Sequence, residues 1–269
     1  MIRAALHNGV AITDPSRAVS IDDRGFNYGD GLFETTLLRA GSIRFLDTHL
    51  QRLRSGAERL GIEVPSALEA DIANLSASCG DGVLKIVITR GPGGRGYRPS
   101  PGAPVNRILS VHPLPATGES SGLTLRWCEM RLSRNAALAG MKHLNRLEQV
   151  MAQNEWHDPG IDEGLVCDTE GELVSATASN VFIVRNGALQ TPDLRFSGVR
   201  GVMRSQVLRV AAELGIPCTE EPLWPHDLEE ANEVFLTNAV RGIRPVAELQ
   251  ERRWQTFPMS SRLSQALKL

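Results

Sequence analysis

The chain has 269 residues, of which 42% are hydrophobic and 22% charged, so we expect one large or two modest folded domains rather than a disordered chain. The formal net charge of -2 lacks the basic excess that nucleic-acid-binding proteins use, and we expect no nucleic-acid partner. Only three of the 29 basic residues are lysines, namely Lys85, Lys142 and Lys268. Because arginine stays charged, chemistry that needs a neutral amine has few positions available.

The first part of the chain has the pattern of strands joined by tight turns. Asn8-Gly9 lies between apolar flanks, which predicts a type I′ hairpin, and residues 29–38 run from a glycine-rich turn into a strand. Asp47-Thr48 can cap a helix with apolar positions from Leu50 to Leu60, ended by Gly61. Residues 83–89 and 108–111 are expected to be further strands.

The second part begins after a stretch rich in helix breakers at residues 113–122. Residues 123–130 alternate as a strand does, and a helix is expected from 202 to 214. Hairpin turns are expected at Glu170-Gly171 and Asn186-Gly187. Another helix face is predicted from the spacing of Leu144, Leu147, Val150 and Met151. No βαβ rhythm repeats, so we predict two α+β domains, 1–115 and 123–269, joined by a linker at 116–122.

The cysteines and the N-terminus give an expectation about location. The four cysteines lie about forty to fifty residues apart without a C-x-x-C pair, which argues against a metal knuckle. No histidine spacing indicates a metal site either. The N-terminus lacks a signal-peptide core, and no apolar run approaches the ~20 residues of a membrane span. We therefore expect a cytoplasmic protein without a metal or membrane partner.

Residues 91–96 match the spacing G-x-G-x-x-G, but they do not resemble a dinucleotide-binding turn. Such a turn must open a helix, and Pro99 and Pro101 prevent one here. Two interpretations of this glycine-rich loop stay open. It presents Arg95 and Arg98, with Tyr97, to a carboxylate substrate, or it is a solvated turn.

Lys142 and two other segments together indicate a cofactor. Lys142 precedes the expected helix at 144–151, whose N-terminal field would lower the pKa of the ammonium group and favour the neutral amine that forms Schiff bases. Arg52 and residues 197–203, which open a helix, are candidates for binding phosphate. The plainer alternatives are a surface lysine, an exposed arginine and a glycine turn. A phosphate site combined with a Schiff-base lysine predicts pyridoxal 5′-phosphate.

Four segments in order, residues 26–35, 49–53, 141–149 and 179–182, resemble the fold-type IV pyridoxal-phosphate enzymes. This family includes branched-chain and D-amino-acid aminotransferases and aminodeoxychorismate lyases. The resemblance extends from about residue 5 to residue 247, and residues 82–97 and 142–150 look most like the lyases. It implies two α+β domains with the cofactor between them, and a homodimer in which a neighbouring loop completes the site.

The resemblance also implies roles for individual residues. Lys142 would be the Schiff-base lysine and the catalytic base, and Arg52 would bind the cofactor phosphate. The rest of the phosphate cradle would come from Gly201, Val202, Met203, Asn238 and Ala239. Tyr28 and Phe33 would form walls of the substrate pocket, and Lys85 would lie near the substrate carboxylates. Because the expected substrate carries two carboxylates, Arg95, Arg98 and Arg107 are further candidate contacts, together with Tyr97 of the glycine-rich loop.

One position departs from the family pattern. Family members usually have a glutamate that pairs with the pyridine nitrogen five residues before the asparagine matching Asn180, and Ser175 stands there instead. A serine does not hold the ring nitrogen protonated as a carboxylate does, so the electron sink is expected to be weaker. A lyase whose product becomes aromatic has another driving force. Glu172 is a candidate substitute, although strand alternation predicts that it faces the other way.

The expected function is therefore conversion of 4-amino-4-deoxychorismate to 4-aminobenzoate and pyruvate, a step of folate synthesis. The nearest alternative is an aminotransferase of the same fold acting on D- or branched-chain amino acids. A non-catalytic relative that binds the cofactor, and a nicotinamide-dependent oxidoreductase, are the remaining alternatives.

Overall fold

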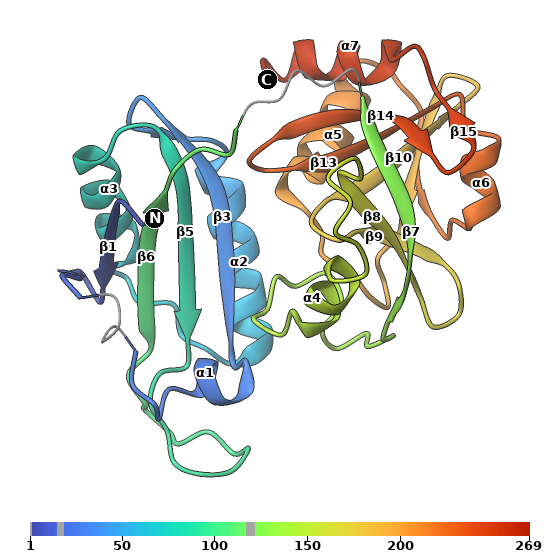
Figure 1. Ribbon diagram of the computed structural model, residues 1–269. Coiled ribbons are helices and arrows are strands. Elements are labelled where there is room, and N and C mark those ends of the chain that lie inside the picture. Colours follow the sequence, from blue (N-terminus) through green and yellow to red (C-terminus); the bar gives the residue numbers. More distant parts are fainter. Residues whose placement is uncertain (1, 15–18, 117–121) are drawn as a thin grey trace. The chain divides into compact units, whose positions relative to one another are not determined.

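The computed structural model describes residues 2–14, 19–116 and 122–269 (Figure 1). Most of the predicted linker, residues 117–121, lies outside the described residues. Contacts divide the chain into two compact units. The first contains the residues up to 117 together with Met141–Asn145, and the second contains the remainder.

The first unit is built on a six-stranded antiparallel sheet in the order β2-β1-β6-β5-β3-β4. The Asn8-Gly9 turn joins β1 to β2 with both residues at positive φ, as the type I′ prediction requires. The predicted strands at 83–89 and 108–111 are confirmed as β5 and β6. The strands are β1 (Ala4–His7), β2 (Val10–Ala11), β3 (Gly31–Arg39), β4 (Ser42–Ile43), β5 (Gly82–Thr89) and β6 (Asn106–His112).

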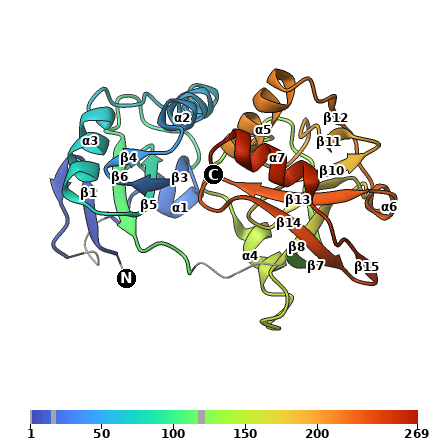
Figure 2. The ribbon, with the colours of Figure 1, turned by 90° about the horizontal axis from the view of Figure 1, so that it is seen from above.

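Helices α2 (Leu46–Leu60) and α3 (Leu68–Ser78) cover one face of this sheet, as the views in Figures 1 and 2 show. Leu50, Leu53 and Ala57 recur along α2 and are buried, and Gly61 ends the helix in the left-handed conformation, as predicted. The N-terminus of α2 differs from the prediction. Phe45 occupies the N-cap position without a side-chain hydrogen bond, and Asp47 lies inside the first turn, where its charge suits the helix dipole. The short helix α1 (Arg24–Tyr28) precedes β3.

The second unit contains a nine-stranded sheet in the order β12-β11-β10-β13-β14-β7-β8-β9, with β15 paired to β14. The predicted hairpin at Asn186-Gly187 connects β10 to β11, with both turn residues at positive φ. The strands are β7 (Leu123–Leu132), β8 (Glu163–Asp168), β9 (Leu173–Ala176), β10 (Asn180–Arg185), β11 (Ala188–Pro192), β12 (Cys218–Glu221), β13 (Glu233–Asn238), β14 (Gly242–Leu249) and β15 (Arg252–Arg253).

Helices α5 (Val202–Glu213) and α7 (Pro258–Ala266) lie side by side over this sheet (Figure 2). Val207, Val210 and Ala211 of α5 pack with Phe182 and Phe235, whose rings stack 5.1 Å apart. The helix predicted at 202–214 is thus confirmed to within one residue. Two shorter helices are α4 (Leu147–Gln153) and α6 (Pro225–Glu229). Within the described residues, no helix is long and apolar enough to span a bilayer.

The segment that carries Lys142 differs from the prediction. It is expected in the C-terminal domain at a helix start, but residues 141–145 group with the first unit. The Phe33 N–H donates to the Lys142 carbonyl at 3.0 Å, and the Leu144 N–H donates to the Gly31 carbonyl at 3.0 Å. The physical reason is that β4 pairs only with the C-terminal end of β3, at Leu38–Arg39. The backbone groups at the N-terminal end of this strand edge therefore need other hydrogen-bond partners.

Helix α4 begins at Leu147, later than predicted, so the helix-dipole argument for Lys142 does not apply to its position. The predicted apolar face of this helix is also not buried. Leu147, Val150 and Met151 expose 70%, 51% and 53% of their surface.

Candidate functional site

Lys142 and Lys85 lie against the same aromatic ring. The Lys142 Nζ is 4.3 Å from the centroid of the Phe33 ring, and the Lys85 Nζ is 5.7 Å from it. Along β3, Phe33 and Thr35 alternate with Glu34 and Thr36, which contact the α2 side of the sheet. Phe33 and the two lysines therefore share the sheet face that points away from α2 and α3. Three of the predicted site residues come together here.

Arg52 belongs to a buried network on the opposite face of the same sheet. Its Nε donates to Glu34 Oε1 at 2.8 Å and its Nη2 donates to Glu34 Oε2, so the pairing is bidentate. His49 Nδ1 lies 2.6 Å from Glu34 Oε2, and both of these residues are at most 1% exposed. Burial by itself would raise the Glu34 pKa, but the Arg52 charge and the hydrogen bonds from His49 and Arg52 outweigh it, and the pKa is lowered.

No role is predicted for Glu34 or His49 from the sequence, although both belong to the motifs that resemble the family. The periodicity of the helix and of the strand is the sequence signal that could have brought these residues together with Arg52. His49 and Arg52 are three residues apart on α2 and therefore lie on one side of it. Glu34 is adjacent to Phe33 in the strand, so its side chain points to the opposite face, toward that helix. The bidentate Glu34 pairing fixes the plane of the Arg52 guanidinium group.

In the second unit, the N-terminus of α5 forms a backbone cradle. Gly201 is the N-cap, and its N–H donates to Asn180 Oδ1 at 3.1 Å, while Asn180 Nδ2 donates to the Val199 carbonyl at 2.8 Å. A Cβ on Gly201 would lie 2.0 Å from Asn180 Oδ1, so only glycine allows this approach. Val202 and Met203 stand in the first turn of α5, where backbone N–H groups lack intrahelical acceptors, and their side chains are buried.

Asn238 is fixed beside Asn180 by a polar chain. Its Oδ1 accepts hydrogen bonds from the Val240 and Arg241 N–H groups, and its Nδ2 donates to Ser179 Oγ at 3.1 Å. Ser179 in turn donates to Glu163 Oε2 at 2.9 Å, which also accepts from Arg244 Nη2. Burial, only partly offset by the Ala178 N–H and Arg244, raises the Glu163 pKa.

Thr237, whose backbone pairs with Asn180, carries a buried hydroxyl without a partner among the described residues. A buried hydroxyl of this kind needs an acceptor or a donor. Together with the α5 backbone N–H groups and the half-buried Ala239 after Asn238, it makes this end of the second unit suitable for a phosphate group.

The glycine-rich loop is held by Arg24, for which no role is predicted from the sequence. The Arg24 guanidinium group donates to the Gly96 and Tyr97 carbonyls at 2.9 and 2.8 Å and is paired with Asp30. The Tyr28 hydroxyl accepts from the Gly96 N–H, and the Tyr28 and Tyr97 rings meet edge to face 5.7 Å apart. No helix follows residues 91–96, which agrees with the exclusion of a dinucleotide site. Arg95 and Arg98 are exposed.

Arg107 does not join the other predicted substrate residues. It pairs with Ile88 across the sheet, on the face that the helices cover, and its Nε donates to Asp71 of α3 at 2.5 Å. Strand alternation thus turns it away from Lys85 and Phe33. Its predicted role in contacting substrate with them does not fit this placement.

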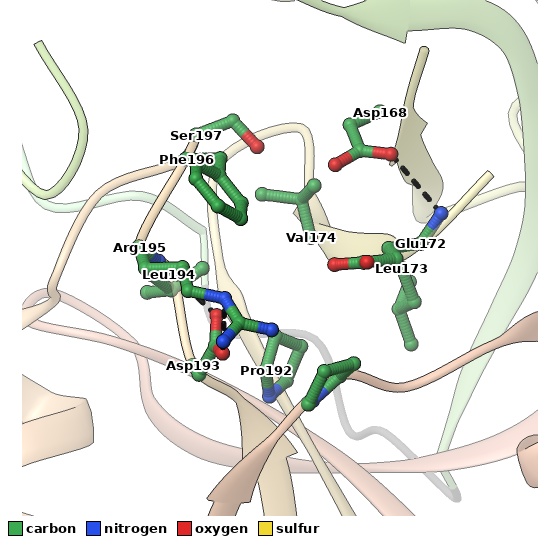
Figure 3. Close-up of a pocket in the computed structure, with 11 residues that line it drawn as sticks. Asp168, Glu172, Leu173, Val174, Pro192, Asp193, Leu194, Arg195, Phe196 and Ser197 are labelled. Atoms are coloured by element: carbon green, nitrogen blue, oxygen red, sulfur yellow. Dashed lines mark hydrogen bonds and ion pairs between the residues drawn. The ribbon is translucent and has the colours of Figure 1, made fainter. Parts of the chain in front are cut away.

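Ser175 lies half-buried in β9, opposite Val166. Glu172, the candidate substitute, precedes β9 and lines a small pocket with Asp168, Arg195 and Phe196 (Figure 3). Its carboxylate lies 3.4 Å from Arg134, which also pairs with Asp168. Glu172 is thus engaged in a separate ion-pair cluster, in agreement with the prediction that it faces away from Ser175.

Comparison with known proteins gives the family. The Amino-transferase class IV family matches residues 31–249, which is most of the chain. The protein belongs to the class IV aminotransferase family. Pyridoxal 5′-phosphate is the cofactor of this family, so the predicted cofactor and the predicted α+β fold class are both confirmed.

Relatives within the class IV family have different names. Aminodeoxychorismate lyase of Vibrio harveyi is 33% identical over 87% of this chain and 88% of its own. A Methanocaldococcus jannaschii protein, provisionally named a branched-chain-amino-acid aminotransferase, is 34% identical over 91% and 87%. The crystal structure of 4-amino-4-deoxychorismate lyase from Pseudomonas aeruginosa superimposes with a TM-score of 0.94 and 42% identity, covering 98% of both chains.

The residues of this class IV protein fit the cofactor. The N-terminus of α5 suits the phosphate, since Gly201 is closed against Asn180 and the Thr237 hydroxyl lacks a partner among the described residues. Lys142 suits the aldehyde carbon, since it carries a primary amine, the group that forms a Schiff base with an aldehyde. Ser175, the residue expected at the pyridine nitrogen, carries a neutral hydroxyl, so it would not supply the carboxylate that the family pattern has there.

Proposed function

We propose that this protein is an aminodeoxychorismate lyase, which converts 4-amino-4-deoxychorismate to 4-aminobenzoate and pyruvate in folate synthesis. The observation that carries this proposal is the pair of lysines on the Phe33 ring. One supplies an amine for catalysis, and the other supplies a cation for an acidic substrate. The 42% identity with the Pseudomonas aeruginosa lyase supports the same reaction.

Lys142 performs the proton transfer in this mechanism. When bound, pyridoxal 5′-phosphate withdraws electrons from the carbon that bears the substrate amine. The neutral Lys142 amine removes the proton from that ring carbon. The electron pair forms a ring double bond as the neighbouring C–O bond breaks, and enolpyruvate leaves. The ring becomes aromatic, and protonation of enolpyruvate gives pyruvate.

The remaining site residues bind and orient the cofactor and the substrate. Arg52, held by Glu34, and the backbone of Gly201, Val202 and Met203 bind the phosphate, while the Asn238-Ala239 turn closes its other side. Phe33 and Tyr28 form walls of the substrate site, and Lys85 meets a substrate carboxylate. Arg95, Tyr97 and Arg98 are further substrate contacts, presented by the loop that Arg24 fixes.

Ser175 supports a lyase over an aminotransferase. Without a carboxylate at this position, the pyridine nitrogen loses the partner that favours its protonated form. An aminotransferase depends on that electron sink throughout its cycle. A lyase that gains aromaticity in its product depends on it less.

The test is incubation of the purified protein with aminodeoxychorismate. We expect 4-aminobenzoate and an equal amount of pyruvate without any added keto acid. Turnover that requires a keto-acid acceptor would instead identify an aminotransferase. That second candidate is supported by the 34% identity with the Methanocaldococcus jannaschii protein. Bound cofactor with no turnover of either kind would favour a non-catalytic relative.

We also propose that the protein works as a homodimer in the cytoplasm. The support for a second copy is the apolar face of α4, because Leu147, Val150 and Met151 are exposed together on one side of a short helix. The support for the cytoplasm is the substrate class, since folate synthesis is an intracellular activity.

A further inference from the structure

Glu163 is a buried acid that takes no part in the proposed proton transfer. It is the first residue of β8 and is 4% exposed. Its Oε1 accepts the Ala178 N–H at 2.7 Å, and its Oε2 accepts hydrogen bonds from Ser179 Oγ and Arg244 Nη2, each at 2.9 Å. Burial raises the Glu163 pKa, and the Ala178 N–H and the Arg244 charge oppose that shift. Three donors on two oxygens are the contacts that suit an ionised carboxylate, which has no hydrogen to donate.

Ser179 links Glu163 to the turn that follows β13. A serine hydroxyl has one hydrogen, and an ionised carboxylate only accepts, so Ser179 donates to Glu163. Its oxygen still has lone pairs, and Asn238 Nδ2 donates to it at 3.1 Å. The Asn238 side-chain oxygen therefore points the other way and accepts the Val240 and Arg241 N–H groups at 3.1 and 2.7 Å. These bonds fix the turn on one side of the proposed phosphate site.

The other oxygen of Glu163 holds the turn that precedes Asn180. Residues 177–179 connect β9 to β10, and the Ala178 N–H within this turn donates to Glu163 Oε1. Asn180 follows directly, and its side-chain oxygen accepts the Gly201 N–H at the start of α5. One carboxylate thus holds the chain on both sides of the proposed phosphate site.

We propose that Glu163 is a positioning residue for the phosphate of pyridoxal 5′-phosphate, and that it acts through Ser179 on the Asn238 turn. As an acceptor for every donor around it, the carboxylate sets the direction of the hydrogen bonds from Ser179 onward. This inference rests on the proposed phosphate site at α5, and it is independent of which reaction the protein catalyses.

Glu163→Gln keeps the size of the side chain and removes one acceptor. A glutamine has a single side-chain oxygen, so its NH2 group must face either the Ala178 N–H or the Ser179 hydroxyl. Against Ala178, two donors oppose each other. Against Ser179, the hydroxyl must accept and turn its hydrogen to Asn238, whose NH2 group then faces the backbone N–H groups that its oxygen accepts in the wild type. Both arrangements disturb a turn beside the phosphate.

The experiment compares two ligands of the apoprotein, pyridoxal 5′-phosphate and pyridoxal, which lacks the phosphate. We expect Glu163→Gln to weaken pyridoxal 5′-phosphate binding about tenfold and pyridoxal binding less than twofold, measured by equilibrium titration. Pyridoxal keeps the aldehyde for Lys142, so the comparison isolates the phosphate. Glu129→Gln, at an exposed position of β7, is the control and should leave both affinities unchanged.

Ser179→Ala tests the link without altering a buried charge. We expect it to weaken pyridoxal 5′-phosphate binding about threefold. Glu163→Gln should cause a smaller loss in a Ser179→Ala background than in the wild type, because the hydroxyl that carries its effect is gone. Additive losses overturn the proposal, and so does an unchanged affinity in Ser179→Ala, even if Glu163→Gln does not fold.

Two further outcomes of the titrations overturn the role of Glu163. One is an equal loss of both ligands in Glu163→Gln, which indicates a general defect of the fold. The other is a loss of pyridoxal 5′-phosphate affinity in Gly201→Ala but not in Glu163→Gln. A loss in neither variant moves the phosphate away from α5 and overturns the proposed site as well. No substrate is present in these titrations, so the lyase assay succeeds or fails separately.

Discussion

At the scale of single residues, the strongest requirement falls on Lys142. Its side chain packs on Phe33, and its backbone is hydrogen-bonded to β3, so the amine is held in one place. We expect Lys142→Ala to lower turnover by about a thousandfold or more, because the base is lost, and to abolish the absorbance band of lysine-bound cofactor. Turnover assays and absorbance spectra of the purified protein check both. Lys268→Met should change neither, and a wild type without any such band would contradict the assignment of Lys142.

Ser175 sets a second expectation at this scale. Ser175→Glu restores a carboxylate that holds the pyridine nitrogen protonated, so amino-group transfer from an amino acid to the cofactor should rise about tenfold or more. Single-turnover spectra with D-alanine and with leucine measure this transfer. Ser175→Gln has similar size without the charge and is the matched control. If Ser175→Glu gains no more than Ser175→Gln, Ser175 does not limit the electron sink.

At the scale of elements, the pairing of α2 with β3 depends on Glu34. This carboxylate receives hydrogen bonds from His49 and Arg52 inside the unit, and it is 1% exposed. Replacing it by glutamine leaves the partly buried Arg52 charge uncompensated, so we expect Glu34→Gln to cost about 3 kcal/mol of stability at neutral pH. Denaturant unfolding measures the loss, and Glu58→Gln, at an exposed position of α2, is the control.

The same carboxylate predicts a pH dependence. The Glu34 pKa in the folded state is below its ordinary value, so the folded chain holds the ionised form more strongly than the unfolded chain does. Its contribution to stability is present above the unfolded pKa and is lost as the pH falls through the lower, folded pKa. The difference in unfolding free energy between wild type and Glu34→Gln should therefore shrink on acidification below the ordinary glutamate pKa. A difference that stays constant there would contradict a lowered pKa.

We propose that phosphate binding depends on the turn from Val199 into α5. A Cβ at Gly201 meets Asn180 Oδ1 at 2.0 Å, so Gly201→Ala must displace the side chain that closes the cradle. We expect at least a tenfold weaker affinity for pyridoxal 5′-phosphate, measured by equilibrium titration of the apoprotein. Adding Asn180→Ala removes the clash and should recover part of the affinity. Gly80→Ala is the control, because no atom lies within 4 Å of its Cβ. Unchanged affinity in Gly201→Ala would place the phosphate elsewhere.

At the scale of the whole molecule, the sequence predicts the turns and helices that depend on neighbouring residues. It does not predict the features that depend on pairing between segments far apart in the chain. Asn186-Gly187 specifies its hairpin because both residues tolerate positive φ, and the apolar spacing of α5 specifies that helix. The pairing of Lys142 with β3 joins segments more than a hundred residues apart, and no local pattern encodes it. Arg107 shows the same limit, since its face depends on the register of β6 against β5.

The exposed face of α4 gives the prediction that concerns the assembled protein. Leu147, Val150 and Met151 expose apolar surface that a second copy would bury, so the wild type should have twice the 29.3 kDa mass of the chain. Leu147→Glu places a charge in that surface and should shift the protein toward the monomer with its secondary structure intact. Light scattering during gel filtration measures the mass, and circular dichroism checks the fold. Val10→Glu, at an exposed position of β2, is the matched control and should remain dimeric. A wild type that is monomeric at all concentrations would exclude this interface, and a dimer that tolerates Leu147→Glu would place it on another surface.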